Sequence, residues 1–359
     1  MLPASSALTF HFPHQGPAPN NPQDIHQTYL NCTFCRATFR NITDIYKATL
    51  IRNRTATVMM DSGSKTPPQP ITNGGSVEHG ETRHDLSQVL QALEAIYDPH
   101  SSNDTRKHAS AYLEHAKRLP EAPAHGFNLA LNKTQPPALR HYGLSMLEYS
   151  IKYGWEDYTI EQGGALRQYV IQLAQNISEE DPVYLRNKVA QLWTEVAKRT
   201  WGAEWRDMDD QLVQLWGSSL HHQAVVLCVL ETLSEEIFNR EDVTAGLRGN
   251  DLGRACVEIF LPAAVLRQHL PTRDKGPNYR CGEDGWLKRL CDLLNWCLSN
   301  GYEKDERIRT CAIKTLNTLR AAMTWVIPKA ITATECIEHV CKALAVPVVS
   351  LQQVTPQHA

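Results

Sequence analysis

The sequence has no long hydrophobic run and no strong net charge. Its longest apolar stretches, such as residues 224–233, fall well short of the roughly 18–20 residues that a membrane-spanning helix needs. The 36 basic and 39 acidic residues leave a formal net charge of −3, which gives no overall attraction to nucleic acids or anionic membranes. The first residues, Met1-Leu-Pro-Ala, lack the basic start and apolar block of a secretory signal. We therefore expect a soluble intracellular protein with no membrane partner.

Catalytic signatures are also missing. The sequence contains no GxxxxGK[ST] phosphate loop, no GxGxxG after a strand, no HExxH zinc motif and no GxSxG nucleophile turn. Its one CxxC pair, Cys32 and Cys35, has no second pair at zinc spacing and can supply two ligands at most. These absences predict a protein that is not an enzyme and that needs no cofactor and no metal.

Residues 1–84 differ in composition from the rest of the chain. Pro, Asn, Thr, Ser and Gly dominate residues 12–23 and 62–81, and no helical period of useful length is present. Such a composition buries too little apolar surface to offset the entropy of the chain, so a disordered leader is predicted over 1–84. We interpret residues 1–58 as a spurious upstream extension, because Met59 or Met60 is the more natural start. An unstructured tail is predicted over 346–359.

From residue 85 onward the pattern changes to successive amphipathic helices. Residues 86–97 carry apolar side chains at i, i+3 and i+4 spacing. Two longer helices begin at Pro136 and Pro182, where a proline in the first turn costs no hydrogen bond. Their separation of about 46 positions, each after a shorter helix, fits the helical hairpin of HEAT-type repeats. We therefore predict an all-α fold, an α-solenoid of HEAT-like helical hairpins over residues 85–345.

The later hairpins are predicted from the same pattern. Residues 204–216 are expected to pair with 218–238, residues 246–270 with 284–298, and residues 305–325 with 333–344. The charged, Gly- and Pro-rich segment near 270–285 is either a partner-binding loop or a tolerated solvent loop.

Tryptophan is frequent in the helical region, and we interpret these side chains as core between stacked hairpins. Trp193 is predicted to be buried, because it shares a helix face with Val189, Leu192 and Val196.

Two segments of the helical region resemble a known family. Arg186-Asn187-Lys188 is followed by Trp201 and Trp205, and residues 140–147 fit the pattern Arg-x-Tyr-Gly-Leu-x-x-Leu. Both segments resemble the exportin N-terminal region of the importin-β (karyopherin-β) superfamily, and they are most like its exportin-five branch with the fungal Msn5-type receptors.

The resemblance implies a nuclear transport receptor of the exportin type, which shuttles between nucleus and cytoplasm through the nuclear pore. Its implied partners are the small GTPase Ran in its GTP form, Phe-Gly nucleoporins, and a protein or RNA cargo. Ran-GTP and cargo would each raise the affinity of the other by the same coupling free energy. Whole receptors of this family are much longer, so the resemblance points to a truncated form. The alternative is a HEAT-repeat scaffold for another complex, of the phosphatase or vesicle-coat type, with no dependence on Ran.

The candidate site residues follow from the expected helix faces. In solenoids of this family the second helix of each hairpin lines the inner surface, so its non-core positions are the candidates for binding Ran. In the first three repeats these positions are Lys107, Glu114, Arg140, Glu148, Lys152, Asn187 and Gln191. The alternative for each is an ordinary solvated position, as in an i, i+4 pair of Glu148 with Lys152. No catalytic or metal-binding residue is expected.

Overall fold

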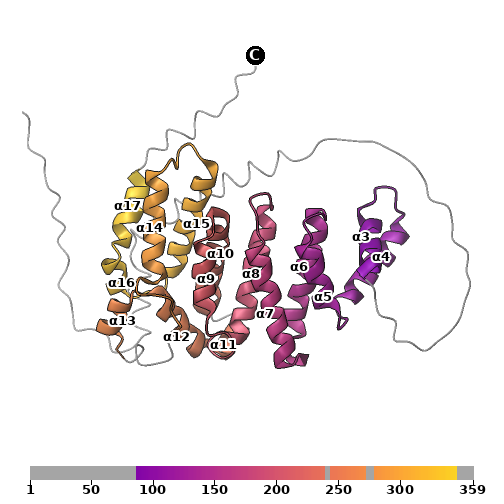
Figure 1. Ribbon diagram of the computed structural model, residues 1–359, viewed down its shortest axis with the longest axis horizontal. Helices are drawn as coiled ribbons and strands as arrows, with labels where there is room; N and C mark the ends of the chain where they lie inside the picture. The colour runs from indigo at the N-terminus through magenta and orange to yellow at the C-terminus, as the bar shows by residue number, and fades with distance from the viewer. Residues whose placement is uncertain (1–85, 239–242, 272–278, 346–359) are drawn as a thin grey trace, which may run out of the picture. The chain divides into compact units, whose positions relative to one another are not determined.

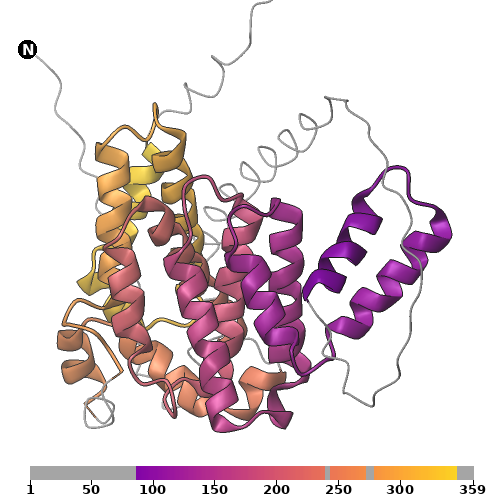
Figure 2. The same ribbon diagram turned by 45° about the vertical axis from the view of Figure 1, so that its right-hand side comes forward.

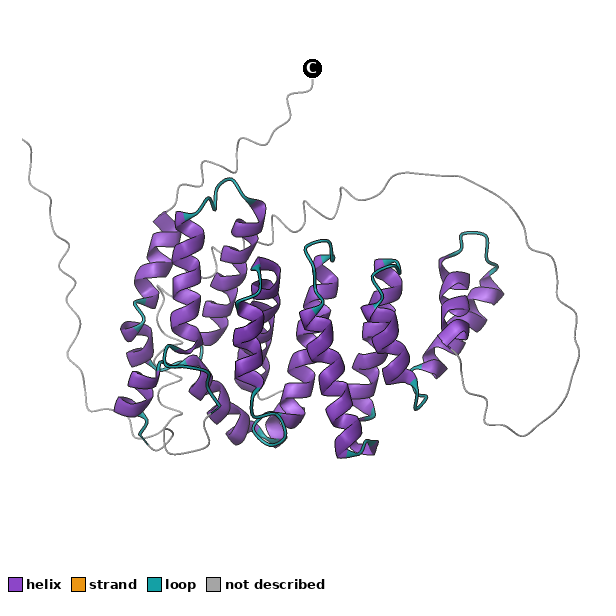
Figure 3. Cartoon of the chain, viewed as in Figure 1, coloured by secondary structure: helices purple, strands orange, loops and turns teal. Residues whose placement is uncertain are grey.

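The computed structural model describes residues 86–238, 243–271 and 279–345 (Figure 1). Within these ranges 76% of the residues are helical, in fifteen α-helices, and no strand is present (Figure 3). The predicted all-α fold is therefore confirmed. None of the helices in these ranges combines the length and hydropathy required to cross a lipid bilayer. The predicted leader over 1–84, the predicted tail over 346–359 and the CxxC pair all lie outside the described residues.

Ten of the helices form five pairs of sequence neighbours. They are α3 (Leu86–Tyr97) with α4 (Asn103–Ala116), α5 (Ala122–Leu131) with α6 (Pro137–Tyr153), α7 (Ile160–Gln175) with α8 (Val183–Thr200), α9 (Met208–Trp216) with α10 (Leu220–Phe238), and α14 (Gly285–Ser299) with α15 (Glu306–Ala322). The second helices α6, α8, α10 and α15 pack against one another in that order (Figures 1 and 2). We call them the second-helix layer, and this side-by-side packing of hairpins is the arrangement of a helical solenoid.

Shorter helices connect and follow these pairs. They are the 3₁₀ turn η1 (Trp155–Asp157), α11 (Val243–Leu247), α12 (Gly249–Phe260), α13 (Ala263–His269), α16 (Pro328–Ala333) and α17 (Cys336–Ala345). The prediction of one helix over 246–270 was wrong, because Leu261 is extended before Pro262 and separates α12 from α13. A proline disfavours the helical conformation of the residue before it, which explains the break.

The predicted pairing of residues 305–325 with 333–344 was wrong, and the pairing of 246–270 with 284–298, present between α12 and α14, is the lesser part of the packing of α14. Helix α14 packs more extensively against α15 than against α12, and α15 packs against α10 in the second-helix layer. The final helix, α17, packs on α14 and α16. Sequence periodicity identifies the faces of these helices, but the choice of neighbour depends on how the hairpins stack.

Local sequence explains where several helices begin. Thr159 and Gln162 form a reciprocal capping box at α7, in which the Thr159 hydroxyl accepts from the Gln162 N–H at 3.3 Å and the Gln162 side chain accepts from the Thr159 N–H at 2.9 Å. Ser102 caps α4 by accepting from the Thr105 N–H at 3.1 Å. Each contact satisfies a backbone donor that the first turn leaves without a partner.

Helices α5 and α6 approach each other unusually closely. A Cβ atom added to Gly126 would lie 2.7 Å from the Gly143 carbonyl oxygen, and one added to Gly143 would lie 2.5 Å from the Gly126 carbonyl oxygen. Both distances are far below a van der Waals contact. Only glycine therefore fits at these two positions without moving the helices apart.

Four tryptophans fill the core between hairpins. Trp193, Trp201, Trp205 and Trp286 are each at most 1% exposed, and the rings of Trp193 and Trp205 lie 5.0 Å apart. The predicted burial of Trp193 is confirmed. Trp296 is an exception to the core interpretation, because 42% of its surface is exposed.

Residues 279–286, which lead into α14, are attached by two buried carboxylates. Asp209 accepts hydrogen bonds from the Cys281 N–H at 2.6 Å and from the Trp286 indole N–H at 2.5 Å. Glu258 accepts from the Tyr279 N–H at 2.9 Å. Burial raises the pKa of Asp209 to about 6, against the partly compensating effect of these hydrogen bonds.

Candidate binding surface on the second-helix layer

The structure places the seven predicted site residues in three different environments. Lys107 and Glu114 on α4 and Asn187 on α8 are exposed. Glu148 and Lys152 on α6 and Gln191 on α8 are partly buried, whereas Arg140 is only 8% exposed. Six of the seven thus have at least partial access to solvent, but most of them already contact other side chains.

Glu148 and Lys152 belong to a set of ion pairs that crosses α6, α8 and α10. Glu148 accepts from Lys152 Nζ at 3.0 Å and also pairs with Lys188 Nζ of the next repeat. Lys152 Nζ lies 3.4 Å from Glu195, which also pairs with Lys198 at 3.2 Å. We call this set, which Glu236 completes, the charge ladder.

The ladder continues into the fourth repeat through a buried lysine. Lys198 is 2% exposed, and its ammonium group lies 2.6 Å from a carboxylate oxygen of Glu236 on α10. Glu195, itself 4% exposed, also accepts from Arg199 at 2.9 Å. A buried charge is tolerated only when it is paired in this way, so the ladder fixes the mutual position of α8 and α10.

Ion pairing also determines the protonation of the ladder. Burial alone would raise the pKa of Glu148, but hydrogen bonds from Lys188 and Lys152 outweigh it and lower that pKa below its ordinary value. For Lys152, burial lowers the pKa, and the pairing with Glu148 and Glu195 more than offsets this and raises it. Both groups are therefore fully charged at neutral pH.

A second cluster joins α8, α10 and α15. The Asn187 amide oxygen accepts from Cys228 Sγ and from Lys314 Nζ, both at 3.3 Å, and Lys314 Nζ lies 2.8 Å from Cys228 Sγ. Nearer the end of the same helices, Arg320 on α15 pairs with Glu235 on α10 at 3.2 Å. Polar contacts between neighbouring second helices thus occur at each step from α6 to α15.

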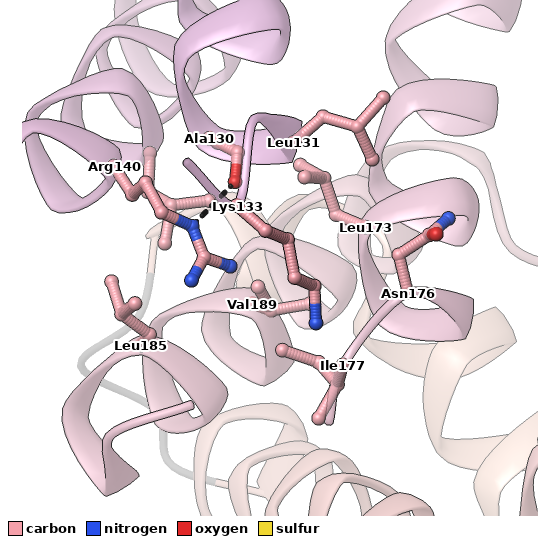
Figure 4. A pocket seen from close by; sticks show the side chains of 10 residues that line it. Ala130, Leu131, Lys133, Arg140, Leu173, Asn176, Ile177, Leu185 and Val189 are labelled. Atoms are coloured by element: carbon pink, nitrogen blue, oxygen red, sulfur yellow. Dashed lines mark hydrogen bonds between the residues drawn. The ribbon is translucent and has the colours of Figure 1, made fainter. Parts of the chain in front are cut away.

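Arg140 does not lie on this surface. It was predicted to occupy a non-core position, and the structure shows that it is buried. Its Nε donates to the Ala130 carbonyl oxygen at 3.0 Å (Figure 4). Its Nη1 pairs with Asp181 in the loop before α8. Asp181 also accepts from Lys133 Nζ at 2.9 Å and from the Ser178 N–H at 2.8 Å. Arg140 is therefore a structural link between the second and third repeats.

The environment of Arg140 leaves little room for a ligand. The cavity beside it measures about 10 Å³ and is lined by Lys133, Leu173 and Val189 among others (Figure 4). A cavity of that size accommodates one water molecule at most. Burial would raise the pKa of Asp181, but the hydrogen bonds from Arg140, Ser178 and Lys133 lower it to about 2.

The sequence-based candidates omit three central members of the ladder: Lys188, Glu195 and Lys198. A signal was available for all three. Lys188 is part of the Arg-Asn-Lys motif, and Glu195 precedes Lys198 and Arg199 at the i+3 and i+4 spacing that favours ion pairs on a helix. Their burial could not be inferred, because it depends on the packing of α8 between α6 and α10.

The polar side chains of the second-helix layer are joined by ion pairs and hydrogen bonds. Across the described ranges no group of three or more His, Cys, Asp or Glu residues is arranged to hold a metal ion. Charges of both signs alternate along the second-helix layer and largely neutralise one another. A partner with charged side chains can replace one member of such an ion pair by its own side chain, so that no charge is left buried and unpaired.

Comparison with known proteins gives one family match. The family described as Exportin 1-like protein matches residues 182–253, from the start of α8 into α12. This region contains the Arg-Asn-Lys motif, the two tryptophans after it and four of the six residues of the charge ladder.

Individual relatives match a longer stretch. Protein MSN5 of Saccharomyces cerevisiae is 29% identical over 273 residues, which are 72% of this chain and 22% of that protein. Exportin-5 of Mus musculus is 24% identical over 277 residues, 72% of this chain and 20% of that protein. Exportin-5 of Homo sapiens is 28% identical over 155 residues, 42% of this chain and 13% of that protein. The chain therefore spans about a fifth of the length of such relatives, and the predicted resemblance is confirmed.

Proposed function

We propose that this exportin-like chain, similar to MSN5 and exportin-5, serves nuclear export by binding Ran in its GTP form through α4 and the second-helix layer of its first repeats. The observation that supports this best is the match to named exportins across the same hairpins that carry the charge ladder. At the level of the family these relatives are transport receptors and not enzymes. The other proposed partners are Phe-Gly nucleoporins and a protein or RNA cargo, with shuttling between nucleus and cytoplasm.

The exposed candidates are the side chains most available to Ran. Lys107 and Glu114 on α4 and Asn187 on α8 are accessible without unpacking the core. Glu148, Lys152 and Gln191 are available only if the partner replaces the contacts of the ladder. Arg140 is better assigned to stability, because removing it would leave Asp181 with one cation fewer.

A titration with Ran loaded with GTP or with GDP tests the proposal. We expect weak binding with a clear preference for the GTP form, because the γ-phosphate orders the GTPase loops that a receptor can grip. Equal affinity for both nucleotide states would leave the alternative, a HEAT-repeat scaffold for another complex.

Charge reversal locates the contact. Lys107→Glu combined with Lys152→Glu should weaken binding to Ran-GTP, and the loss should be smaller at high salt, where such contacts are already screened. The matched control is Lys329→Glu, which reverses an exposed charge on α16 outside the second-helix layer. If the control weakens binding as much as the double variant does, the layer is not the binding surface.

A further inference from the structure

Among the described residues, one lysine of the second-helix layer has no carboxylate within ion-pair distance. The other lysines of the layer, Lys152, Lys188 and Lys198, each pair with a glutamate. Lys314 on α15 instead places its Nζ 2.8 Å from the Sγ atom of Cys228 on α10. The amine that the other lysines use for ion pairs is therefore directed at a sulfur atom.

Contacts on two sides hold this amine and sulfur together. On the polar side, the Asn187 amide oxygen of α8 accepts from Cys228 Sγ and from Lys314 Nζ, both at 3.3 Å. On the core side, the fully buried Thr318 hydroxyl of α15 donates to the Leu227 carbonyl oxygen of α10 at 3.2 Å. This buried bond lies one turn from the lysine and next to the cysteine. It fixes the register in which α15 packs on α10, and that register brings the two side chains into contact.

The sulfur of Cys228 is open to small dissolved molecules, because the residue is partly exposed. Five other cysteines of the described residues are buried: Cys256, Cys291, Cys297, Cys311 and Cys336. A peroxide that reaches a thiol converts it to a sulfenic acid, and a sulfenic acid condenses with a thiol or a nitrogen atom in contact with it. At Cys228 the atom in contact is the Lys314 nitrogen.

We infer that Cys228 and Lys314 form an oxidation-sensitive cross-link between α10 and α15. A peroxide transfers one oxygen atom to the Cys228 thiol, which becomes a sulfenic acid, and its other oxygen leaves as water. The Lys314 ammonium group loses a proton to solvent, and the neutral amine attacks the sulfur. An S–N bond forms, the S–O bond breaks, and the hydroxyl leaves as water with a second proton from the nitrogen. The product is a sulfenamide.

The cross-link changes the second-helix layer at a defined point. It removes the positive charge of Lys314 and the thiol proton that Asn187 accepts, and it ties α10 to α15 covalently. A thiol reductant breaks the S–N bond, restores the thiol and the amine, and is itself oxidised to a disulfide, so the change is reversible. The inference concerns the chemistry of this chain and holds whichever partner the surface takes.

Peptide mass spectrometry of the full chain after treatment with hydrogen peroxide tests the cross-link. Remaining thiols are blocked with iodoacetamide, and the protein is digested with trypsin without reductant. We expect residues 207–240 joined to residues 310–320, lighter than the two separate peptides by the two hydrogen atoms lost. Trypsin should not cleave after Lys314, because its side chain is no longer a free amine, whereas a disulfide through Cys311 would leave that cleavage intact. Dithiothreitol should separate the two peptides. The same product with one more oxygen atom, supplied by a second peroxide, also supports the pair.

Lys314→Arg is the matched variant, because it keeps the positive charge and removes the amine that attacks sulfur. The joined peptide should disappear, and labelling of Cys228 by dimedone, which traps sulfenic acids, should rise several-fold over wild type. Cys228→Ser should abolish both signals. Cys281 is the internal comparison: it is also partly exposed, but a hydrogen bond with Asp210 raises its pKa to about 11, so it should be oxidised more slowly at neutral pH.

Three results would overturn the inference. One is equal dimedone labelling of Cys228 in wild type and in Lys314→Arg. Another is a joined peptide that survives Lys314→Arg. The third is a Cys228 that peroxide leaves unoxidised in the folded wild-type chain.

Discussion

Two buried aspartates hold two regions of this molecule by different chemistry. Asp181 lies between the second and third repeats, where the hairpins are regular, and receives the cations Arg140 and Lys133. Asp209 lies on α9 and holds the region where α12–α14 depart from the regular pattern, and its hydrogen bonds come from the neutral donors Cys281 N–H and Trp286 Nε1–H. Both side chains are at most 3% exposed.

The difference appears in the charge that each site stabilises. With two cations beside it, Asp181 has a pKa lowered to about 2, although burial acts in the opposite direction. Without a direct cation partner, Asp209 has a pKa raised by burial to about 6. The regular region therefore fixes its repeats with compensated ion pairs. The irregular region binds its connecting segment with a carboxylate whose ionised form is costly to bury.

The largest loss of stability is expected from a substitution in the core of the regular region. Trp193→Ala should lower the free energy of unfolding by about 3–5 kcal/mol, because it empties a fully buried aromatic site against Trp205. Thermal unfolding followed by circular dichroism measures the loss. Trp193→Phe is the control. The indole N–H of Trp193 has no acceptor within the described residues, so its replacement by phenylalanine loses no hydrogen bond and should lower the free energy of unfolding far less. Equal losses for the two variants would contradict this account.

Removing Asp209 is the next largest perturbation and tests the irregular region. Asp209→Ala leaves the Cys281 and Trp286 N–H groups without their acceptor and should cost about 2–4 kcal/mol at pH 4. The folded-state pKa of about 6 lies above the ordinary value of 3.8, so the wild type loses stability as the pH rises through this window. The difference in free energy of unfolding between wild type and variant should therefore become smaller between pH 4 and pH 7, as measured by urea unfolding. A deficit that widens would show that the pKa is not raised.

Asp181 should give the opposite dependence on pH. Its folded-state pKa of about 2 lies below the ordinary value of 3.8, so its contribution is complete above that value and is lost as the pH falls toward 2. Asp181→Asn should cost about 1–2 kcal/mol at pH 6 and progressively less at pH 3 and pH 2. Urea unfolding at these three pH values measures it. A cost independent of pH would mean that Asp181 acts through packing and not through its charge.

The smallest effect belongs to the charge ladder. Glu148→Lys or Lys188→Glu alone should cost about 0.5–1 kcal/mol, because the pair is only partly exposed. The two together should re-form the contact between positions 148 and 188 but not the one that Glu148 makes with Lys152, so only part of the cost should be recovered. Both costs should shrink in 0.5 M salt. The matched control is the exposed pair Glu338 and Lys342, where the same swap should change stability by a few tenths of a kcal/mol at most. Equal effects at the two sites would remove the distinction between the ladder and an ordinary surface pair.

The regular region could be predicted from sequence because its signals are local. Pro136 and Pro182 precede the first residues of α6 and α8, and the hydrophobic faces around Trp193 point into the core as expected. In the irregular region the decisive contacts join distant residues, such as Asp209 with Cys281 and Trp286. No periodic pattern encodes a contact of that kind.

The candidate site was predicted unevenly for a similar reason. Glu148 and Lys152 are i, i+4 neighbours on one face of α6, and both lie in the ladder. Arg140 precedes Glu148 by eight residues, which places it about 80° around the helix at ~100° per residue. It faces Asp181, and the position of that loop is set only when the third repeat packs on the second.

The glycine pair between α5 and α6 has a consequence for the geometry of every repeat beyond it. In a stack of hairpins, the packing of the two helices within one hairpin sets the surface that it presents to the next, so a change within one hairpin alters the tilt of those that follow. Gly126 and Gly143 act as a spacer of fixed thickness. A single added methyl group there would alter the pitch of the stack, and thereby which distant side chains a rigid partner can reach at the same time.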